Sequence, residues 1–288
     1  MKCNHIVVNA MSGRETSYVW DNSETAEVSK RFESLKNLYD PITFSRIEAL
    51  GIVEGWKCLE VGGGGGSVSK WLSSKVGSSG RVLVTDINPL FLNELQGKLD
   101  NVEVLTHDIT SESGIPKNSF DLAHARLVLV HLSQREKALS NMVSTLKPGG
   151  RVLIEDFDWI LNEVCRDYHP VLGVPPLMTT DLFAKLMQAR DKVLKQHGTD
   201  IHYARRLYSM LRSNDLLDVG ISVGGYGAWS GGSDGAKLHI ANSLQSRKEI
   251  LATGLMSEKE FDAAINLMND PQWKVFSSMM ISGWGRRP

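Results

Sequence analysis

The chain has few cysteines and no strong excess of charge of either sign. Its three cysteines, Cys3, Cys58 and Cys165, are scattered over 288 residues. This spacing gives neither a disulfide framework nor a zinc site, so we expect a reducing, cytoplasmic setting. The formal net charge is −1, and no long basic run is present. We therefore expect no nucleic-acid partner, because binding to phosphates requires clustered Lys and Arg.

Long apolar runs are also missing. No segment approaches the ~20 apolar residues of a membrane-spanning helix, and the amino-terminal residues lack the apolar core of a signal peptide. We expect no membrane partner. No carboxylate cluster that could hold a catalytic divalent metal is evident, so we expect no metal. With 42% hydrophobic residues the chain can bury a full core, which suits one α/β domain with additions.

The feature that the chain does have is a run of five glycines, residues 62–66, between two segments of regular pattern. Residues 57–61, KCLEV, form a short run that is capable of β structure. Over residues 68–76 the apolar side chains recur with the spacing of one helical face. A glycine turn between strand and helix leaves backbone N–H groups open to a ligand, and the helix N-terminus favours negative charge. We infer a site for a small, partly anionic molecule.

The spacing of acids around the glycines narrows the class of ligand. Glu60, Gly62, Gly64 and Gly66 give the pattern E-x-G-x-G-x-G. Asp86 ends the next apolar strand, RVLVTD, twenty residues after Gly66. An acid at the tip of the second strand can accept both hydroxyls of a ribose, as in dinucleotide-binding folds. These residues predict a nucleotide-like ligand, and a tight surface turn without a ligand is the alternative.

Five segments between residues 53 and 156 resemble, in the right order, the motifs of class I S-adenosylmethionine-dependent methyltransferases, in particular the bacterial small-molecule, UbiE-like subgroup. They are LEVGGGGGSVSKWL, VTDINP, LTHDI, FDLAHARLVLVHL and LKPGGRVLIED. The resemblance implies an α/β, Rossmann-like sheet of seven strands in the order 3-2-1-4-5-7-6, with the last strand antiparallel. It also implies S-adenosylmethionine as cofactor and S-adenosylhomocysteine as product.

The resemblance further assigns the glycine loop and its neighbours to the methionine and ribose parts of the cofactor. Gly62, Gly64 and Gly66 would pass under the methionine part. Glu60 would support the loop, and Asp86 would hold the ribose.

The adenine and the sulfonium would be held by residues at the ends of other strands. By the same resemblance, Asp108 would bond the adenine amino group, and Ile87 and Ile109 would sandwich the ring. Arg126, just past the fourth strand, would lie beside the sulfonium end.

The amino-terminal residues are expected to be helical. Apolar spacing predicts helices over residues 25–39 and 42–50, separated by a break at Pro41. This segment resembles the leader of the same methyltransferase subgroup, in which an aromatic residue and an arginine approach the cofactor. Tyr18 and Arg31 match those positions. Packing against the edge of the sheet is the other interpretation of these side chains.

The organisation expected for the whole chain has four consecutive parts: a helical cover over residues 1–50, a cofactor-binding core over 51–156, a helical substrate lid over 157–216, and the completion of the sheet with intervening helices over 217–288. The lid is inserted between strands 5 and 6, and it would lie above the carboxyl edge of the sheet, where ligands bind in open α/β folds.

Several element boundaries can also be predicted. A helix is expected to begin at Pro89, and the fifth strand is expected over residues 151–155 after the stop signal K-P-G-G. Capping boxes are expected at Ser133 and Ser257. The last segment, residues 274–288, is expected to form the final antiparallel strand.

The reaction requires that the enzyme align a nucleophile behind the methyl carbon, exclude water and remove a proton where one is present. The candidate bases are His131, His169, Asp156 and Asp158, and the sequence does not choose among them. Helix entry or packing is the other interpretation of His131. The family's N/D-P-P-Y/F signature for methylation of amino groups is missing after strand 4. We therefore predict O- or C-methylation of a small apolar or aromatic metabolite, in secondary metabolism.

Two other functions stay open. A protein of this fold could bind the cofactor without transferring the methyl group, as a cyclase or pericyclase of natural-product biosynthesis. An NAD-dependent oxidoreductase is a further alternative, because G-x-G-x-x-G can be drawn through the glycine run, but LKPGG and Asp108 would then have no role. A homodimer is one assembly that is compatible with the sequence.

Overall fold

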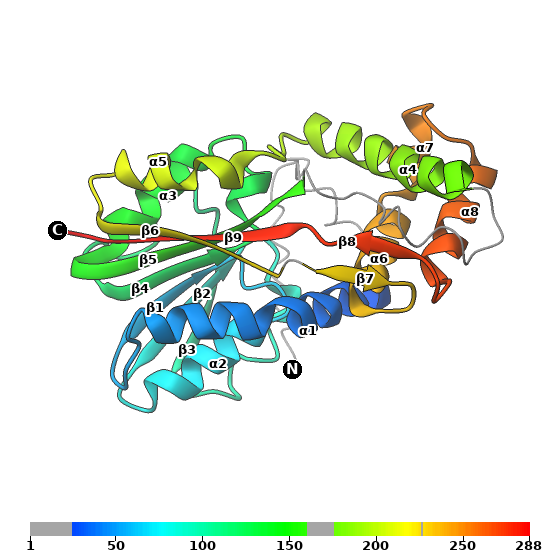
Figure 1. Ribbon diagram of the computed structural model, residues 1–288. Coiled ribbons are helices and arrows are strands. Elements are labelled where there is room, and N and C mark those ends of the chain that lie inside the picture. The colour runs from blue at the N-terminus through cyan, green and yellow to red at the C-terminus, as the bar shows by residue number, and fades with distance from the viewer. Residues whose placement is uncertain (1–24, 160–175, 226) are drawn as a thin grey trace, which may run out of the picture.

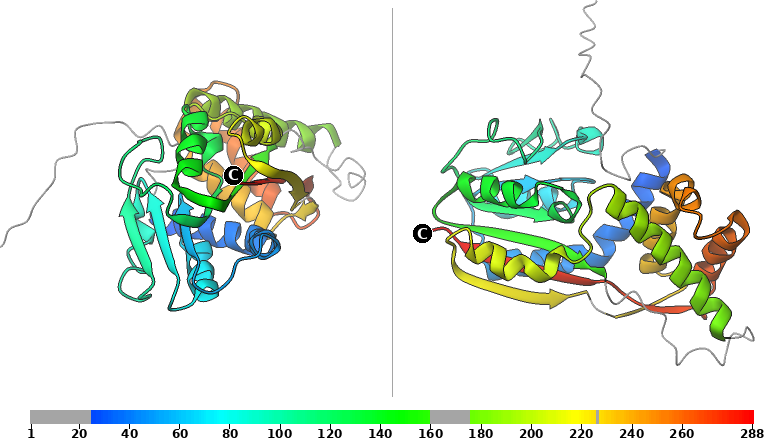
Figure 2. Two further views of the ribbon diagram at one scale, coloured as in Figure 1. Left: turned by 90° about the vertical axis from the view of Figure 1, so that its left-hand side faces the viewer. Right: turned by 90° about the horizontal axis from the view of Figure 1, so that it is seen from above.

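The computed structural model describes residues 25–159, 176–225 and 227–288. In this part of the chain a seven-stranded sheet lies between two layers of helices, and a second, mainly helical region extends beyond one end of the sheet (Figure 1). Figure 2 shows the same two regions from the side and from above.

The sheet has the strand order β3-β2-β1-β4-β5-β9-β6, in which β9 pairs antiparallel with both β5 and β6. The predicted fold, with the seventh strand antiparallel between strands 5 and 6, is therefore confirmed. The strands are β1 (Lys57–Val61), β2 (Arg81–Asp86), β3 (Val102–Thr106), β4 (Phe120–Arg126), β5 (Leu146–Asp158), β6 (Leu217–Gly224) and β9 (Met279–Arg286).

The strand order reverses at β1, and this reversal positions the site. Val61, the last residue of β1, pairs with Thr85 of β2 on one side and with Ala125 of β4 on the other. The residues that follow β1 therefore emerge between the carboxyl ends of two parallel strands. In open α/β sheets this switch point is where ligands bind.

Helices cover both faces of the sheet. The longer elements are α1 (Thr25–Ala49), α2 (Ser67–Val76), α3 (Arg135–Thr145), α4 (Pro176–Gln196), α5 (Leu207–Arg212), α6 (Asp234–Gln245), α7 (Arg247–Ala252) and α8 (Glu258–Asn269). The described residues also form the short 3₁₀ turns η1 (Pro89–Phe91), η2 (Leu129–His131) and η5 (Tyr203–Arg206). In Figure 1, α1 and α2 lie on one face of the sheet, and α3 and α5 lie on the other.

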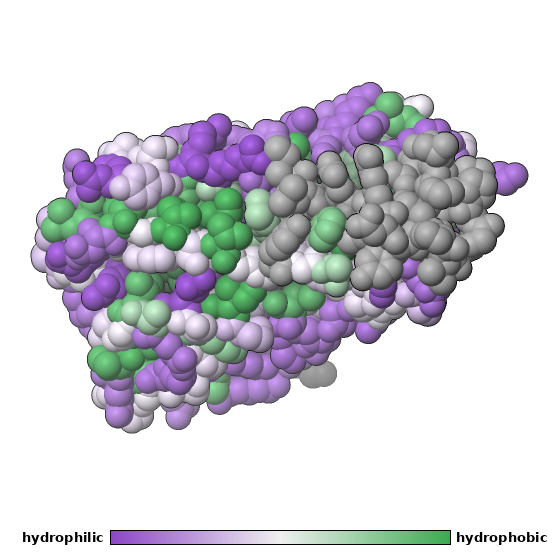
Figure 3. All heavy atoms as spheres, in the orientation of Figure 1, coloured by the Kyte–Doolittle hydropathy of each residue, from purple (hydrophilic) through white to green (hydrophobic). Residues whose placement is uncertain are grey.

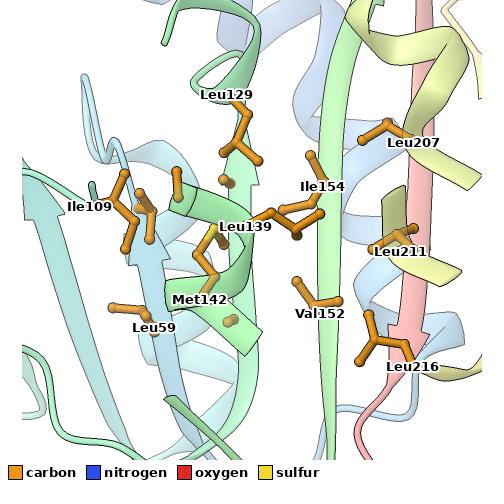
Figure 4. Close-up of a cluster of buried hydrophobic side chains, with 14 of the residues drawn as sticks. Leu59, Ile109, Leu129, Leu139, Met142, Val152, Ile154, Leu207, Leu211 and Leu216 are labelled. Atoms are coloured by element: carbon orange, nitrogen blue, oxygen red, sulfur yellow. The ribbon is translucent and has the colours of Figure 1, made fainter. Parts of the chain in front are cut away.

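The alternation of side chains along β5 divides the core between the two faces. Val152 and Ile154 point toward α3, where Figure 4 shows them packed with Leu139 and Met142. Leu153 points to the other face and belongs to the cluster under α1 and α2. Since successive side chains of a strand face opposite ways, one apolar strand serves both layers.

The second region has a core of its own. Phe183 of α4 packs with Ile250 of α7, with Phe261 of α8 and with Trp273. A two-stranded sheet of β7 (Ala228–Ser230) and β8 (Lys274–Phe276) adjoins these helices. Helix α4, which belongs to the segment predicted as a lid, thus packs against α7 and α8, which follow β6.

Three expected helix starts or stops differ from the structure. The break predicted at Pro41 was wrong, because α1 runs through it; the buried side chains of Tyr39 and Ile47 hold the turns on both sides, which offsets the lost backbone hydrogen bond. Pro89 begins only η1, followed by turns. Ser133 is not a cap, because the first backbone bond of α3 is from Ala138 to Gln134. The capping box at Ser257 is confirmed.

Two expected strand boundaries also change. The fifth strand begins at Leu146 rather than at residue 151, because LKPGG pairs with the start of β4 and with the chain end: Gly149 donates to the carbonyl of Arg287. The final segment is two strands, β8 and β9, in different sheets. Between them the Ser277 hydroxyl donates to the carbonyl of Gly225, where the chain passes from one sheet to the other.

The outer face of the sheet edge is partly apolar. Leu217, Ile221 and Val223 of the edge strand β6 are exposed, and Figure 3 shows apolar residues gathered over this edge. The homodimer remains a prediction.

Among the described residues, no helix combines the length and the apolar character needed to span a bilayer.

Candidate cofactor and acceptor site

The glycine loop after β1 adopts a conformation that requires glycine. Gly62, Gly64 and Gly66 have φ angles of +70°, +51° and +76°, a region that other residues rarely adopt. A Cβ atom at Gly62 would lie 2.3 Å from a methyl of Val128, and one at Gly66 would lie 2.6 Å from Leu95. The loop ends at Gly66, which caps α2.

Asp86 is bound to this loop. Its Oδ2 accepts a hydrogen bond of 3.0 Å from the backbone N–H of Gly64, and its Oδ1 accepts one of 3.0 Å from the N–H of Asn88. The carboxylate is only partly buried. The acid at the tip of β2 and the glycine loop therefore form one unit at the switch point of the sheet. Beyond Asp86, the side chain of Ile87 is 48% exposed.

Asp108, the acid that follows β3, is more exposed to solvent than Asp86. Asp108 is exposed, and its Oδ1 accepts from the backbone N–H of Thr110 at 2.9 Å and from its hydroxyl at 2.7 Å. Ile109 is buried in the core under α3. Of the two isoleucines expected to sandwich an adenine ring, Ile87 is thus the one that offers an exposed apolar surface.

Arg126 ties the end of β4 to α1. Its Nη2 donates to Oδ1 of Asp40 at 2.8 Å, and its Nη1 donates to the hydroxyl of Thr43 at 3.0 Å. The same Asp40 oxygen accepts from the hydroxyl of Ser67, the first residue of α2. Because Asp40 neutralises the guanidinium, Arg126 can lie near a cationic ligand with little repulsion. The contacts also hold α1 beside the glycine loop.

A charged triad is buried below the loop. His124 of β4 lies between Glu60 of β1 (Nδ1–Oε2 2.6 Å) and Glu155 of β5 (Nε2–Oε2 3.3 Å). Glu155 also accepts from the hydroxyls of Thr43 and Ser282. Burial by itself lowers the pKa of His124, but Glu60 and Glu155 outweigh it and raise the pKa to about 9. Glu60 therefore binds His124 directly, and its link to the glycine loop is through β1.

A small cavity of about 20 Å³ lies beyond the ends of β4 and β5. Its walls are mostly apolar, with two arginines, a histidine and an asparagine; they are Arg31, Leu35, Leu127, His131, Phe157, Trp159, Arg190, Leu194, Leu238 and Asn242. Arg31, predicted to approach the cofactor, lies in this wall, where its Nε donates to Oδ1 of Asn242 at 2.9 Å.

Of the candidate bases in the described residues, His131 is the one that lines this cavity. Its Nδ1 lies 3.2 Å from the hydroxyl of Thr199. Burial, together with Arg31 and Arg135, lowers the pKa of His131 to about 3. The imidazole is therefore neutral at pH 7.

The two acids of β5 have other surroundings. Asp158 accepts from Nε and Nη2 of Arg205, at 2.5 and 3.2 Å. Burial raises the pKa of Asp156 well above its usual range, which favours the neutral acid. Tyr18 and His169 lie outside the described residues. Within the described ranges no group of three or more His, Cys, Asp or Glu is placed to hold a metal ion.

Sequence reasoning missed four polar residues of this region: His124, Arg190, His239 and Asn242. A signal for two of them was present. His124 interrupts the apolar strand FDLAHAR, and Arg190 lies four residues from both Leu186 and Leu194 on the apolar face of a helix. A charged residue at a position of an apolar stripe is rarely buried without a reason.

Comparison with known proteins shows which family one part of the chain matches. Residues 59–154 match a family described as a methyltransferase domain. Over 117 residues the chain is 35% identical to the ubiquinone/menaquinone biosynthesis C-methyltransferase UbiE of Idiomarina loihiensis, a match that covers 38% of this chain and 46% of the relative. The chain thus spans about half the length of the curated relatives that it matches.

Solved structures with a similar fold cover more of the chain. A putative methyltransferase from Bacillus halodurans has a TM-score of 0.53 at 16% identity, over 85% of this chain and 98% of the other. Geranyl diphosphate C-methyltransferase from Streptomyces coelicolor, a complex with Mg²⁺, geranyl diphosphate and S-adenosylhomocysteine, has a TM-score of 0.52 at 16% identity, over 94% and 86%.

These findings and the strand order agree. Residues 59–154 form a class I methyltransferase domain, and the resemblance inferred from the five ordered motifs is confirmed.

Proposed function

We propose that this protein transfers a methyl group from S-adenosylmethionine to the oxygen or carbon of a small-molecule acceptor by direct in-line displacement. The observation that carries the proposal is the glycine loop, bonded through Gly64 to the Asp86 carboxylate at the switch point of the sheet. A solved methyltransferase of similar fold is a complex with S-adenosylhomocysteine, the product that S-adenosylmethionine leaves after methyl transfer, which supports S-adenosylmethionine as the cofactor. The relatives named C-methyltransferases support carbon as one possible acceptor atom.

The residues around the loop fit this cofactor. Gly62, Gly64 and Gly66 provide a backbone surface without Cβ atoms for the methionine part. The partly exposed carboxylate of Asp86 would accept the ribose hydroxyls. Bound there, the cofactor supplies an electrophilic methyl group on a sulfonium.

The outer residues complete the proposed cofactor site. Asp108 would accept from the adenine amino group, and Ile87 and Ile109 would flank the ring, with most of the contact from the exposed Ile87. Arg126 would lie near the sulfonium end, neutralised by Asp40. Glu60 would hold the glycine loop in place indirectly, by fixing the end of β1. Tyr18 and Arg31 remain predicted neighbours of the cofactor.

The acceptor would reach the methyl group from the cavity side, beyond β4 and β5. Phe157 and Trp159, with ring centroids 5.8 Å apart, would exclude water from the reacting atoms. His131, neutral and with a pKa of about 3, would orient the acceptor rather than deprotonate it, because a base that weak has little driving force at neutral pH. Asp158 is held by Arg205. We therefore favour an acceptor atom that is nucleophilic without a protein base, and His169 remains an untested candidate.

The test is calorimetric titration of the purified protein with S-adenosylmethionine, S-adenosylhomocysteine and NAD in parallel. We expect the first two to bind and NAD not to bind. A screen of small acceptors by mass spectrometry should then detect the gain of a methyl group. Binding of NAD alone would move the function to hydride transfer, whereas binding of S-adenosylmethionine with conversion of a substrate at unchanged mass would indicate a cyclase.

A further inference from the structure

Arg190 of α4 is a buried cation with an unused hydrogen-bonding edge. Its side chain is 2% exposed. Its Nη1 lies 2.9 Å from Nδ1 of His239 on α6, whereas its Nε and Nη2 have no hydrogen-bond partner among the described residues. Among residues 25–159, 176–225 and 227–288, no carboxylate oxygen lies within ion-pair distance of this guanidinium.

The geometry of the free edge matches an oxyanion. In a guanidinium group, the N–H bonds of Nε and Nη2 lie in one plane and point the same way. Two oxygens of a carboxylate or a phosphate can accept both bonds at once. His239 occupies the opposite side of the group, so the guanidinium is already held in a fixed orientation.

His239 does not compensate the charge of Arg190. Burial, and then the neighbouring Arg190, lower the pKa of His239 well below its usual range. The imidazole is therefore neutral, and its Nδ1 accepts the bond from Arg190. Burying a cation without an ion-paired carboxylate is costly: burial lowers the pKa of Arg190, and the charge of the neighbouring Asp191 offsets this only in part. An anion beside the free edge would remove this cost.

Arg190 lines the cavity that we assign to the acceptor. The two charged side chains of that lining, Arg190 and Arg31, are both cations. The cavity, of about 20 Å³, has room for one or two water molecules, since a water molecule needs roughly 10–15 Å³ by the same measure, and the oxygens of an anion would take the place of this water. Phe157 and Trp159 provide the apolar wall toward the ends of the strands.

We propose that the free Nε and Nη2 edge of Arg190 binds a carboxylate or phosphate of the methyl acceptor, while the apolar part of the acceptor lies against Phe157 and Trp159. This inference rests on the proposed function for the identity of the ligand as an acceptor. The oxyanion site itself rests only on the geometry of Arg190, His239 and the cavity.

The experiment compares sodium benzoate, inorganic phosphate and neutral benzamide as probes, by calorimetric titration of the full chain at constant ionic strength. Benzoate and benzamide have the same ring and differ in charge, and phosphate tests the other oxyanion. We expect at least one anion to bind about 10- to 100-fold more tightly than benzamide, the range expected for charge-assisted hydrogen bonds. Benzoate and phosphate then distinguish a carboxylate from a phosphate site.

Three variants locate the effect. Arg190→Met should remove the preference for the anion without lowering the thermal unfolding midpoint of the free protein, because it removes an uncompensated buried charge. Arg190→Lys keeps the positive charge but loses the two parallel N–H donors of the guanidinium. We expect it to keep only part of the preference for the anion. Lys195→Met changes an exposed cation on the same helix and should bind the anion like the wild type.

The proposal is overturned if neither anion binds better than benzamide, or if both Arg190 variants bind the anion like the wild type. Titration with S-adenosylhomocysteine in the same samples separates the two proposals. Should the wild type prefer an anion through Arg190 but not bind S-adenosylhomocysteine, the methyltransferase function fails and the oxyanion site stands. Should it bind S-adenosylhomocysteine without any preference for anions, only the oxyanion site fails.

Discussion

The triad of Glu60, His124 and Glu155 predicts that this protein loses stability as the pH rises above neutral. The pKa of His124 is raised from 6.5 to about 9 in the folded protein. Because the folded protein holds the proton more tightly than the unfolded chain does, the resulting stabilisation is fully present below pH 6.5. It is lost progressively as the pH rises from 6.5 to about 9.

The magnitude follows from the interval between the two pKa values. At about 1.4 kcal/mol per pH unit, the interval from 6.5 to about 9 corresponds to up to ~3 kcal/mol in the free energy of unfolding. His124 is fully buried, so solvent does not reduce this value. His131 and His239 have lowered pKa values and act in the other direction, with effects confined to pH values below 6.5.

The assay is urea denaturation at several pH values between 6.5 and 9, at constant ionic strength, with the slope m checked for constancy. The variant His124→Gln leaves Glu60 and Glu155 buried without a cation, and it should cost about 3–5 kcal/mol near neutral pH. Its decrease in stability between pH 6.5 and 9 should be smaller than that of the wild type by up to ~3 kcal/mol, because the contribution of His124 is gone, whereas the raised pKa of Asp156 acts in the same direction in both proteins. His202→Gln, at an exposed histidine, is the control and should behave like the wild type.

Two results would refute this reasoning. One is a wild-type free energy of unfolding that stays constant between pH 6.5 and 9. The other is a decrease of the same size in His124→Gln, which would assign the titration to another group.

Two further predictions concern the loop and a cap. Asp86→Ala should weaken binding of S-adenosylhomocysteine by about 1–3 kcal/mol, because hydrogen bonds to a charged group are lost. The control Asp100→Ala, at an exposed aspartate, should leave the affinity unchanged. If Asp86→Ala and the wild type have equal affinities in calorimetry, Asp86 does not hold the ribose. Ser257→Ala should lower the free energy of unfolding by about 1 kcal/mol, because it removes the capping box of α8. Ser140→Ala, exposed within α3, is the matched control in urea denaturation; an equal loss there would show that the cap contributes nothing of its own.

Much of the cofactor half could be predicted because its signals are local in the sequence. The run at residues 62–66 must turn, and Asp86 must end the second strand, wherever the rest of the chain lies. The strand order was implied by the resemblance of five motifs, in sequence order, to those of a known family, and each motif is a strand with its loop. Where boundaries were mispredicted, long-range packing decided the outcome: α1 continues through Pro41 because Tyr39 and Ile47 are both buried.

The sequence by itself determined the class of fold, the glycine loop and the acid that is bonded to it, because these depend on residues that are close along the chain. Only the tertiary structure decided which distant residues meet. Arg190 and His239 are 49 positions apart, and the cavity that Arg190 shares with Arg31 is lined by three helices that lie far apart in the sequence, α1, α4 and α6. Such convergence leaves no periodic trace in the sequence, because it depends on how α1, α4 and α6 pack rather than on the pattern within any one of them.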